Sequence, residues 1–228
     1  IVCTYNRADL LKNILGFLVR TASSDPEHIE ILVVDNNSSD RTRDLARDLS
    51  GENPSLRIRY IFEQRQGISY ARNTGVRQAD GDSIVFLDDD VVPDRDWFRG
   101  LTEGLEKYPY VIAMGGRITP LFTTRIPGWM RKNELWKKLH GVIISHDKGE
   151  DYAYYDDVDG ILPFGANMLF RKEAFLRYGL FDVNLGRGKK LTSNEDIEFF
   201  RRLIQAGEKV VYNPKMHVQH LVEQKRMG

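Results

Sequence analysis

The stretch Ile84-Val85-Phe86-Leu87-Asp88-Asp89-Asp90 decides how this chain folds. Four apolar residues in a row are typical of a strand buried on both faces. The three carboxylates that follow would lie at the carboxyl end of that strand, where adjacent negative charges repel unless something compensates them. Oxygen ligands at this density suit a hard divalent cation that bridges to phosphate oxygens. A solvated acidic turn is the simpler alternative, but the buried strand ahead of the cluster favours a metal site.

The segments before this cluster alternate between strand-like and helix-like patterns, which indicates a βαβ architecture. Strand-like runs cover residues 1–4, 29–35, 57–63 and 83–87. In open parallel sheets, ligands bind at the carboxyl ends of the strands, so the polar residues there should line one crevice. These residues are Thr4, Tyr5, Asn6, Asp35, and Asp88 to Asp90. The GxGxxG fingerprint and the P-loop are both absent, so a nucleotide crevice here would have a different design.

Helices are predicted between these strands and again in the second half of the chain. Asn6 is predicted to cap the first helix, because apolar residues recur at helical spacing after it. Further strands are predicted at 111–118, 165–171 and 209–212. Residues 127–140 carry tryptophans among lysines and arginines. This segment is either an ordinary helix with a solvated basic face or a basic amphipathic helix that touches a membrane.

Composition narrows the class of protein. Lys plus Arg equals Asp plus Glu at 33 each, which argues against a general nucleic-acid binder. Cys3 is the single cysteine, so an internal disulfide and a cysteine-only zinc site are excluded. No apolar run approaches the roughly 20 residues that span a bilayer, and no signal peptide is visible. We expect a cytoplasmic protein, with residues 127–140 as a candidate contact with the inner membrane face. The chain opens without a methionine, and we expect both ends to be trimmed.

Four stretches, taken in their order and spacing, resemble the family 2 glycosyltransferases, which have a GT-A fold. They are residues 2–7 (VCTYNR), 31–40 (ILVVDNNSSD), 67–90 (GISYARNTGVRQADGDSIVFLDDD), and 164–167 together with 194–196. The resemblance implies an α/β fold with a mixed, mostly parallel central sheet flanked by helices. It also implies a single domain over residues 1–228, with a nucleotide-binding half at 1–95 and an acceptor-binding half at 96–228.

The family resemblance implies an inverting, metal-dependent transfer of a sugar from a nucleotide diphosphate sugar to a hydroxyl, in glycan or polysaccharide biosynthesis. Mn²⁺ or Mg²⁺ would bridge the two phosphates. Asp90 is the expected ligand, while Asp88 and Asp89 would hold the ribose, the metal's waters or the metal itself. His220 is the expected histidine ligand and His217 its competitor. On a strand these two histidines would face opposite sides, because their separation is odd.

The resemblance also assigns the acidic pair near the start of a predicted helix. Asp196 would be the general base that takes the proton of the attacking hydroxyl. Acidic residues also favour the first turn of any helix through its dipole, which is the alternative explanation. Glu195 would orient the acceptor. The basic, glycine-rich residues 186–190 would be either a lid over the diphosphate or a mobile loop.

Donor contacts follow from the same resemblance. Asp35 would accept a hydrogen bond from the nucleobase, and a carboxylate can read the imide N–H of uracil, which favours UDP. Arg72 would contact the base or a phosphate, and Asn167 would bind donor or acceptor hydroxyls. Thr4, Tyr5 and Asn6 would offer polar contacts near the base and ribose. The acceptor would be a glycan, a lipid-linked molecule or another hydroxyl compound, and the residues do not fix the oligomeric state.

Two other functions were weighed. The run Leu87-Asp88-Asp89-Asp90-Val91-Val92 also resembles the nucleophile motif of haloacid-dehalogenase phosphatases, in which Asp88 would be phosphorylated and Asp90 would act as acid. That motif usually opens its domain on the first strand, whereas here three strand-like segments precede it. A non-catalytic subunit that binds nucleotide sugars is the second alternative. The presence of Asp196 and of the acidic cluster argues against it.

Overall fold

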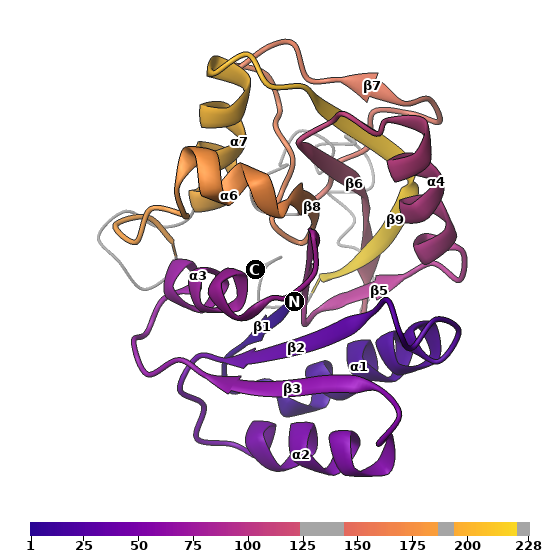
Figure 1. The fold of residues 1–228 in the computed structure, drawn as a ribbon, viewed down its shortest axis with the longest axis vertical. Helices are drawn as coiled ribbons and strands as arrows, with labels where there is room; N and C mark the ends of the chain where they lie inside the picture. Colours follow the sequence, from indigo (N-terminus) through magenta and orange to yellow (C-terminus); the bar gives the residue numbers. More distant parts are fainter. Residues whose placement is uncertain (124–143, 187–193, 223–228) are drawn as a thin grey trace.

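A computed structural model describes residues 1–123, 144–186 and 194–222. The predicted basic helix at 127–140 and most of the glycine-rich segment at 186–190 lie outside these residues. In the described part, a nine-stranded sheet has the order β3-β2-β1-β4-β8-β6-β9-β5, and β7 pairs with β9 (Figure 1). The sheet is mixed and helices pack on it, so the predicted α/β class is confirmed.

The elements have the following bounds. The strands are β1 (Val2–Thr4), β2 (Glu30–Asp35), β3 (Arg57–Phe62), β4 (Ser83–Asp88), β5 (Val91–Pro93), β6 (Ala113–Phe122), β7 (Ala153–Tyr154), β8 (Asn167–Arg171) and β9 (Val210–Val222). The helices are α1 (Ala8–Ala22), α2 (Thr42–Glu52), α3 (Ile68–Gln78), α4 (Trp97–Lys107), α6 (Lys172–Tyr178) and α7 (Glu195–Gln205).

The first half of the sheet is parallel and the second half is mixed. Strands β3, β2, β1 and β4 pair in parallel, with α1 and α2 on one face and α3 on the other (Figure 1). Strand β8 then pairs antiparallel with both β4 and β6, while β6 and β9 run parallel. The parallel pairing is therefore more restricted than expected. The carboxyl ends of β1, β2 and β4 nevertheless meet at one edge, as the sequence predicted.

Strand β4 is buried on both faces because it separates two apolar clusters. Ile84 and Phe86 pack into an aromatic cluster with Phe170, Phe199 and Phe200 of β8 and α7. Val85 and Leu87 face the opposite, mainly aliphatic cluster. A continuous apolar run fits this environment, since both sets of alternating side chains leave water. The prediction of a buried strand is confirmed, with Ile84, Phe86 and Leu87 buried and Val85 partly buried.

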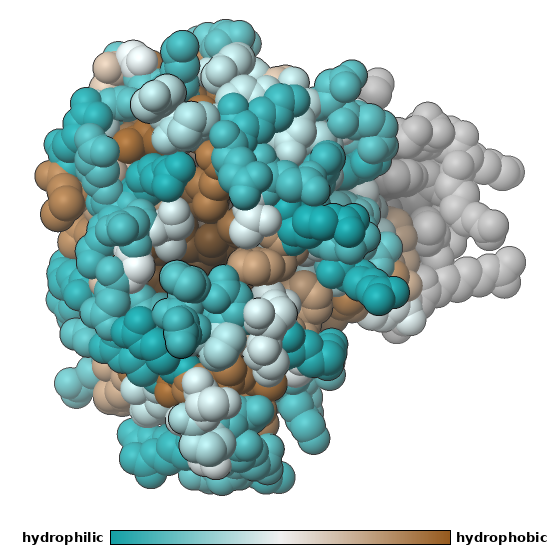
Figure 2. Space-filling view, turned by 45° about the vertical axis from the view of Figure 1, so that its right-hand side comes forward, coloured by the Kyte–Doolittle hydropathy of each residue, from teal (hydrophilic) through white to brown (hydrophobic). Residues whose placement is uncertain are grey.

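Apolar surface is also recessed away from the strand carboxyl ends. A cavity of about 300 Å³ lies between α1, α4 and the amino ends of β2 and β4, and its lining is mainly aliphatic and aromatic. Figure 2 shows apolar side chains gathered in a hollow on one face, whereas polar side chains cover most of the surrounding surface. The candidate chemical residues named above do not line this cavity.

Two local predictions were wrong. Helix α1 begins after Arg7, and Asn6 adopts φ 52 and accepts a hydrogen bond from the Ser39 N–H instead of capping the helix. The Asp40 carboxylate accepts the Ala8 N–H at 2.9 Å and supplies the missing cap across the loops. Strand β9 extends far beyond the predicted 209–212. A register shift opposite Gly116 lets the strand pass Pro214, which could not continue a regular ladder.

Close packing at that register shift gives a stability prediction. A Cβ on Gly116 would lie 2.1 Å from Asn167 Nδ2 and 2.5 Å from the Met216 carbonyl oxygen. Gly116→Ala should therefore lower the free energy of unfolding by about 1–3 kcal/mol, measured by urea denaturation. Gly51→Ala in α2 is the matched control, because a Cβ there meets nothing within 4 Å, and it should not destabilise. Equal denaturation midpoints for Gly116→Ala and the parent would contradict this packing.

Candidate active site

A polar cavity of about 350 Å³ opens at the carboxyl ends of β1, β2 and β4. Two residues of the acidic cluster line it, together with the start of α7 and the loop before β8. Its lining comprises Cys3, Thr4, Tyr5, Arg7, Asn36, Gln66, Gly67, Ile68, Arg72, Asp88, Asp89, Ile144, Phe164, Gly165, Ala166, Asn194, Glu195, Asp196 and Ile197. The topology therefore brings most of the predicted site residues to one place.

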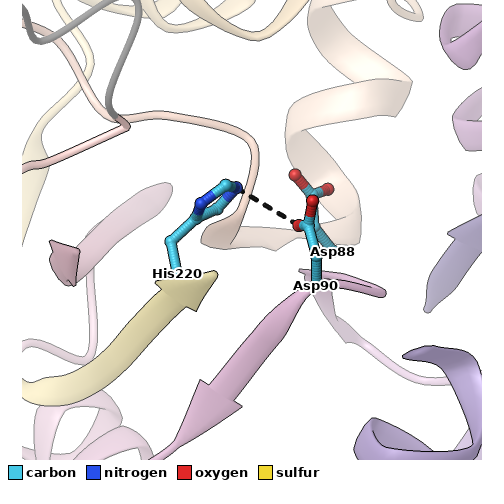
Figure 3. A group of neighbouring side chains, drawn as sticks. All are labelled: Asp88, Asp90 and His220. Carbon is cyan, nitrogen blue, oxygen red and sulfur yellow. Dashed lines mark ion pairs between the residues drawn. The ribbon is translucent and has the colours of Figure 1, made fainter. Parts of the chain in front are cut away.

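Strand β9 places one of the two candidate histidines beside the acidic cluster. Strand β5 follows the three aspartates directly and pairs antiparallel with β9, with Val91 opposite His220. His220 Nε2 lies 3.2 Å from Asp90 Oδ1 (Figure 3). His217 lies elsewhere, in hydrogen bonds with Asp94 at 2.6 Å and with Thr119 at 2.8 Å. Of the two histidines left open by the sequence, His220 is the one at the cluster.

The donor set fits a divalent cation. Asp88, Asp90 and His220 each offer one ligand atom, and these atoms lie within 4.8 Å of one another (Figure 3). His220 is buried, and its Nδ1 has no hydrogen-bond partner among the described residues. Nε2, the ring nitrogen beside Asp90, is the atom that would reach a cation held by the carboxylates. Carboxylate oxygens with one imidazole suit Mn²⁺ or Mg²⁺ better than a soft metal.

The third carboxylate, Asp89, is occupied by protein groups. Thr4 Oγ1 donates to Asp89 Oδ2 at 2.7 Å, and Arg7 Nη1 donates to Asp89 Oδ1 and to Asp90 Oδ2 at 2.9 Å each. Burial raises the pKa of Asp89 to about 6, against the opposing effect of Arg7 and of the Thr4 hydrogen bond. Arg7 was not singled out from the sequence. Its place directly after the polar Thr4-Tyr5-Asn6 loop was the available signal.

Two predicted donor contacts are engaged within the protein. Asp35 is buried, and its carboxylate accepts hydrogen bonds from the Ser38 N–H at 2.8 Å and from the Tyr60 hydroxyl at 2.7 Å. Asn6 uses its side-chain oxygen to hold the loop after β2. Both residues shape the loops around the cavity. Thr4 and Tyr5, by contrast, line the cavity directly.

Asn167 lies in the core and does not line the cavity. It is completely buried at the start of β8, where its oxygen accepts the Trp97 indole N–H at 3.1 Å. Its amide nitrogen donates to the carbonyl oxygens of Arg117 and Met216. The predicted contact with sugar hydroxyls is therefore not supported, because these core contacts already use both ends of the amide. Asn167 ties β8 to β6 and β9 instead.

The acidic pair of α7 also lines the cavity. Asp196 Oδ2 accepts the Gly165 N–H at 2.5 Å, which fixes the carboxylate beside the loop before β8. Glu195 is buried and accepts a hydrogen bond from Arg72, whose guanidinium also lies 3.5 Å from Asp88 Oδ1. Burial raises the pKa of Glu195, and the neighbouring Asp196 adds to this, whereas Arg72 opposes it. Arg72 thus connects Asp88 of the acidic cluster to Glu195 of α7.

Backbone strain is concentrated around this cavity. In the described ranges, the non-glycine residues with positive φ are Asn6, Asn37 and Asn194, at 52°, 67° and 85°. They lie after β1, after β2 and immediately before α7, which are the loops that carry the candidate residues. Asparagine is the side chain that best tolerates this conformation, and such strain is typical of functional sites.

Comparison with known proteins identifies the family. A family model described as glycosyl transferase family 2 matches residues 1–179. The chain belongs to glycosyltransferase family 2. This family 2 glycosyltransferase is 27% identical over 225 residues to the glucosyl-dolichyl phosphate glucuronosyltransferase of Haloferax volcanii, covering 96% of this chain and 67% of the relative. It is 28% identical over 228 residues to the succinoglycan biosynthesis protein ExoM of Rhizobium meliloti, covering 99% and 67%.

Solved structures agree on the fold. A Pyrobaculum calidifontis mannosyltransferase in complex with GDP-Man and Mn²⁺ superposes with a TM-score of 0.70 at 21% identity, over 99% of this chain and 57% of that one. S. aureus TarS in complex with UDP-GlcNAc gives 0.66 at 15% identity, over 98% and 58%. The family 2 enzyme therefore has the predicted GT-A fold, and it spans little more than half of these structures. Among its described residues, no helix is long and apolar enough to cross a bilayer.

Proposed function

We propose that this glycosyltransferase moves a sugar from a metal-bound nucleotide diphosphate sugar to a hydroxyl acceptor, with inversion at the anomeric carbon. The observation that carries the proposal is that a cation-type cluster and a fixed carboxylate both reach one cavity. Asp88, Asp90 and His220 form the cluster, which meets the cavity at Asp88, and the carboxylate of Asp196, held by the Gly165 N–H, lines the same cavity. A single displacement needs both groups, one for the leaving diphosphate and one for the attacking hydroxyl.

The donor half of the reaction belongs mainly to residues 1–95. A divalent ion, when bound, would neutralise the departing diphosphate. Asp88 and Asp90 would hold it with His220, which comes from the other half of the chain through the β5–β9 pairing. Arg7, partly exposed and held by Asp89 and Asp90, would place a fixed positive charge beside the phosphates. The structure of the mannosyltransferase with GDP-Man and Mn²⁺ supports this type of donor complex.

UDP is the favoured nucleotide. Thr4 and Tyr5 line the cavity and would contact the base and ribose, whereas Asp35 is buried and would hold the surrounding loop through Ser38 and Tyr60. TarS, which was solved with UDP-GlcNAc, supports this choice, although GDP in the mannosyltransferase shows that the fold also accepts a purine. Arg72 faces Asp88 and would act on the donor through this carboxylate.

The acceptor half belongs to the loop before β8 and the start of α7. The acceptor oxygen would bond to the anomeric carbon as the carbon–phosphate oxygen bond breaks, and its proton would pass to Asp196. The Gly165 N–H holds one oxygen of Asp196, so the carboxylate is oriented before substrate arrives. Glu195 would orient the acceptor from the neighbouring position.

The acceptor is proposed to be a growing glycan or a lipid-linked sugar. The relative from Haloferax volcanii is named for a dolichyl phosphate substrate, and ExoM for succinoglycan biosynthesis, and both names support this class. A lipid-linked acceptor would suit an enzyme at the inner face of a cytoplasmic membrane. The phosphatase alternative does not fit, since the acidic cluster follows the fourth strand of a GT-A sheet rather than opening a phosphatase domain.

Removing the general base should abolish transfer without loss of donor binding. Asp196→Asn is expected to lower kcat by about 100-fold or more, because an amide cannot take the acceptor proton. Donor and Mn²⁺ affinities, measured by calorimetry, should stay close to those of the parent. Glu198→Gln is the matched control, because Glu198 lies in the same turn and pairs with Arg202 on the helix surface. Near-normal turnover by Asp196→Asn would refute the assignment of the base.

The two histidines of β9 offer a matched test of the metal site. His220→Asn should weaken Mn²⁺ binding by about tenfold or more, because it removes a ligand of the cluster. His217→Asn, three residues earlier, should leave Mn²⁺ affinity unchanged. Titration calorimetry with MnCl₂ measures both, and circular dichroism confirms that the variants are folded. Equal losses for the two variants, or none, would place the metal elsewhere.

Thermal denaturation with a panel of nucleotide sugars tests the donor. A ligand at a concentration 100 times its dissociation constant stabilises the folded state by about 2.7 kcal/mol, a rise in Tm of roughly 5–10 °C for a chain of this size. With Mn²⁺ present, UDP-sugars should give the larger rise and GDP-sugars a smaller one. The reverse order would overturn the UDP preference while leaving the transfer mechanism intact.

A further inference from the structure

Arg72 lies between Asp88 and Glu195 and faces both carboxylates. Its guanidinium is buried, with 5% of the side chain exposed, and it packs over the rings of Phe86 and Phe181 at 5.9 and 5.8 Å. Nη1 donates to Glu195 Oε1, and Nη2 lies 3.5 Å from Asp88 Oδ1. Arg72 thus links a candidate metal ligand to the residue that precedes the candidate base.

Gly165 completes a closed set of contacts with these residues. A Cβ at Gly165 would lie 2.1 Å from Arg72 Nη2, so only glycine leaves room for the guanidinium in this position. The Gly165 N–H also donates to Asp196 Oδ2. The position of Arg72 and the orientation of Asp196 therefore depend on the same backbone segment. A displacement of the guanidinium could therefore move the Gly165 backbone and, with it, the carboxylate of Asp196.

Asp88 faces one positive charge and is a candidate ligand for a second. It belongs to the cation cluster with Asp90 and His220, and it also faces Arg72. A metal that draws on Asp88 lessens its attraction for the guanidinium. Glu195 can then take a greater share of Arg72, because its buried Oε2 has no hydrogen-bond partner among the described residues. Two carboxylate oxygens allow the bidentate geometry that arginine favours.

We propose that Arg72 is a positioning residue that couples metal loading at Asp88 to the placement of the Glu195–Asp196 pair: Arg72 already bonds Glu195, and it gives up its longer contact with Asp88 to hold Glu195 alone when the cation binds. The inference rests on the proposed function, because it takes Asp88 as a metal ligand and Asp196 as the base. It assigns Arg72 a role between the two halves of the site in place of a direct donor contact. The enzyme would then complete its acceptor side only after its metal is in place.

The coupling predicts opposite effects on metal affinity. In Arg72→Met, Asp88 has no competing cation, so Mn²⁺ should bind about fivefold more tightly or better. In Glu195→Gln, Arg72 turns to Asp88, so Mn²⁺ should bind about fivefold more weakly. In the double variant no guanidinium remains to redirect, so Glu195→Gln should have no further effect and Mn²⁺ affinity should match that of Arg72→Met. The two substitutions are therefore expected to be non-additive.

Calorimetric titration of Mn²⁺ in the absence of nucleotide sugar tests the cycle. If Glu195→Gln weakens Mn²⁺ binding by the same factor in both backgrounds, Glu195 acts only through its charge, and the proposal is overturned. No effect in either background overturns it as well. Glu198→Gln is the control, because it removes an equal charge from the same helix without touching Arg72, and it should leave Mn²⁺ affinity unchanged.

Arg72→Met leaves the buried Glu195 without its partner, and this could unfold the protein. A second variant covers that case. Gly165→Ala displaces the guanidinium while retaining its charge, so Glu195→Gln should again lose its effect in that background. If it keeps its full effect there, the coupling does not run through Arg72. Measuring sugar transfer by the parent separates the two proposals. Transfer with an additive cycle refutes the coupling alone, whereas absence of both transfer and Mn²⁺ binding refutes the proposed function and the coupling together.

Discussion

Negative charge at the end of a buried strand is the constraint on which the rest of this site depends. Asp88 to Asp90 follow β4, and burial raises the pKa of both Asp88 and Asp89. The residues that offset the cost of burying these charges come from three different elements. Arg7 follows β1, Arg72 lies on α3, and His220 lies on β9. The cluster therefore forms only when three distant parts of the chain are in place, which ties the chemistry of the site to the completed fold.

Sheet topology delivers these partners. Parallel pairing of β1 with β2 and β4 brings three polar strand ends to one edge, as open α/β sheets generally do. The position of His220 depends on a second feature, because β9 must pair with both β6 and β5. The register shift opposite Gly116 absorbs Pro214 and lets β9 continue to Val222. Irregularity in this strand is thus what carries His220 to the aspartates.

Features that depend on neighbouring residues could be predicted from the sequence. The apolar runs predicted the strands of the parallel half. The odd separation of His217 and His220 implied that only one of them could face the cluster, and only His220 does. Contacts between residues far apart in the sequence were not predictable in this way. Nothing in the sequence around Asn167 shows that its amide is consumed by Trp97 and two backbone carbonyls. Nor could spacing reveal that Arg72 would be buried against Glu195, 123 positions away.

The pairing of Arg72 with Glu195 is a poor device for stability alone. Taking both charges out of water costs several kcal/mol, and apolar residues of similar size often replace such pairs without loss. Here the cost is increased, because Glu195 Oε2 has no partner among the described residues and Gly165 must remain without a side chain. What the pair supplies is orientation: one planar guanidinium faces Glu195 and Asp88 together, so its position relates these two carboxylates. The single displacement proposed above would need that geometry more than it would need the stability that an apolar core would give.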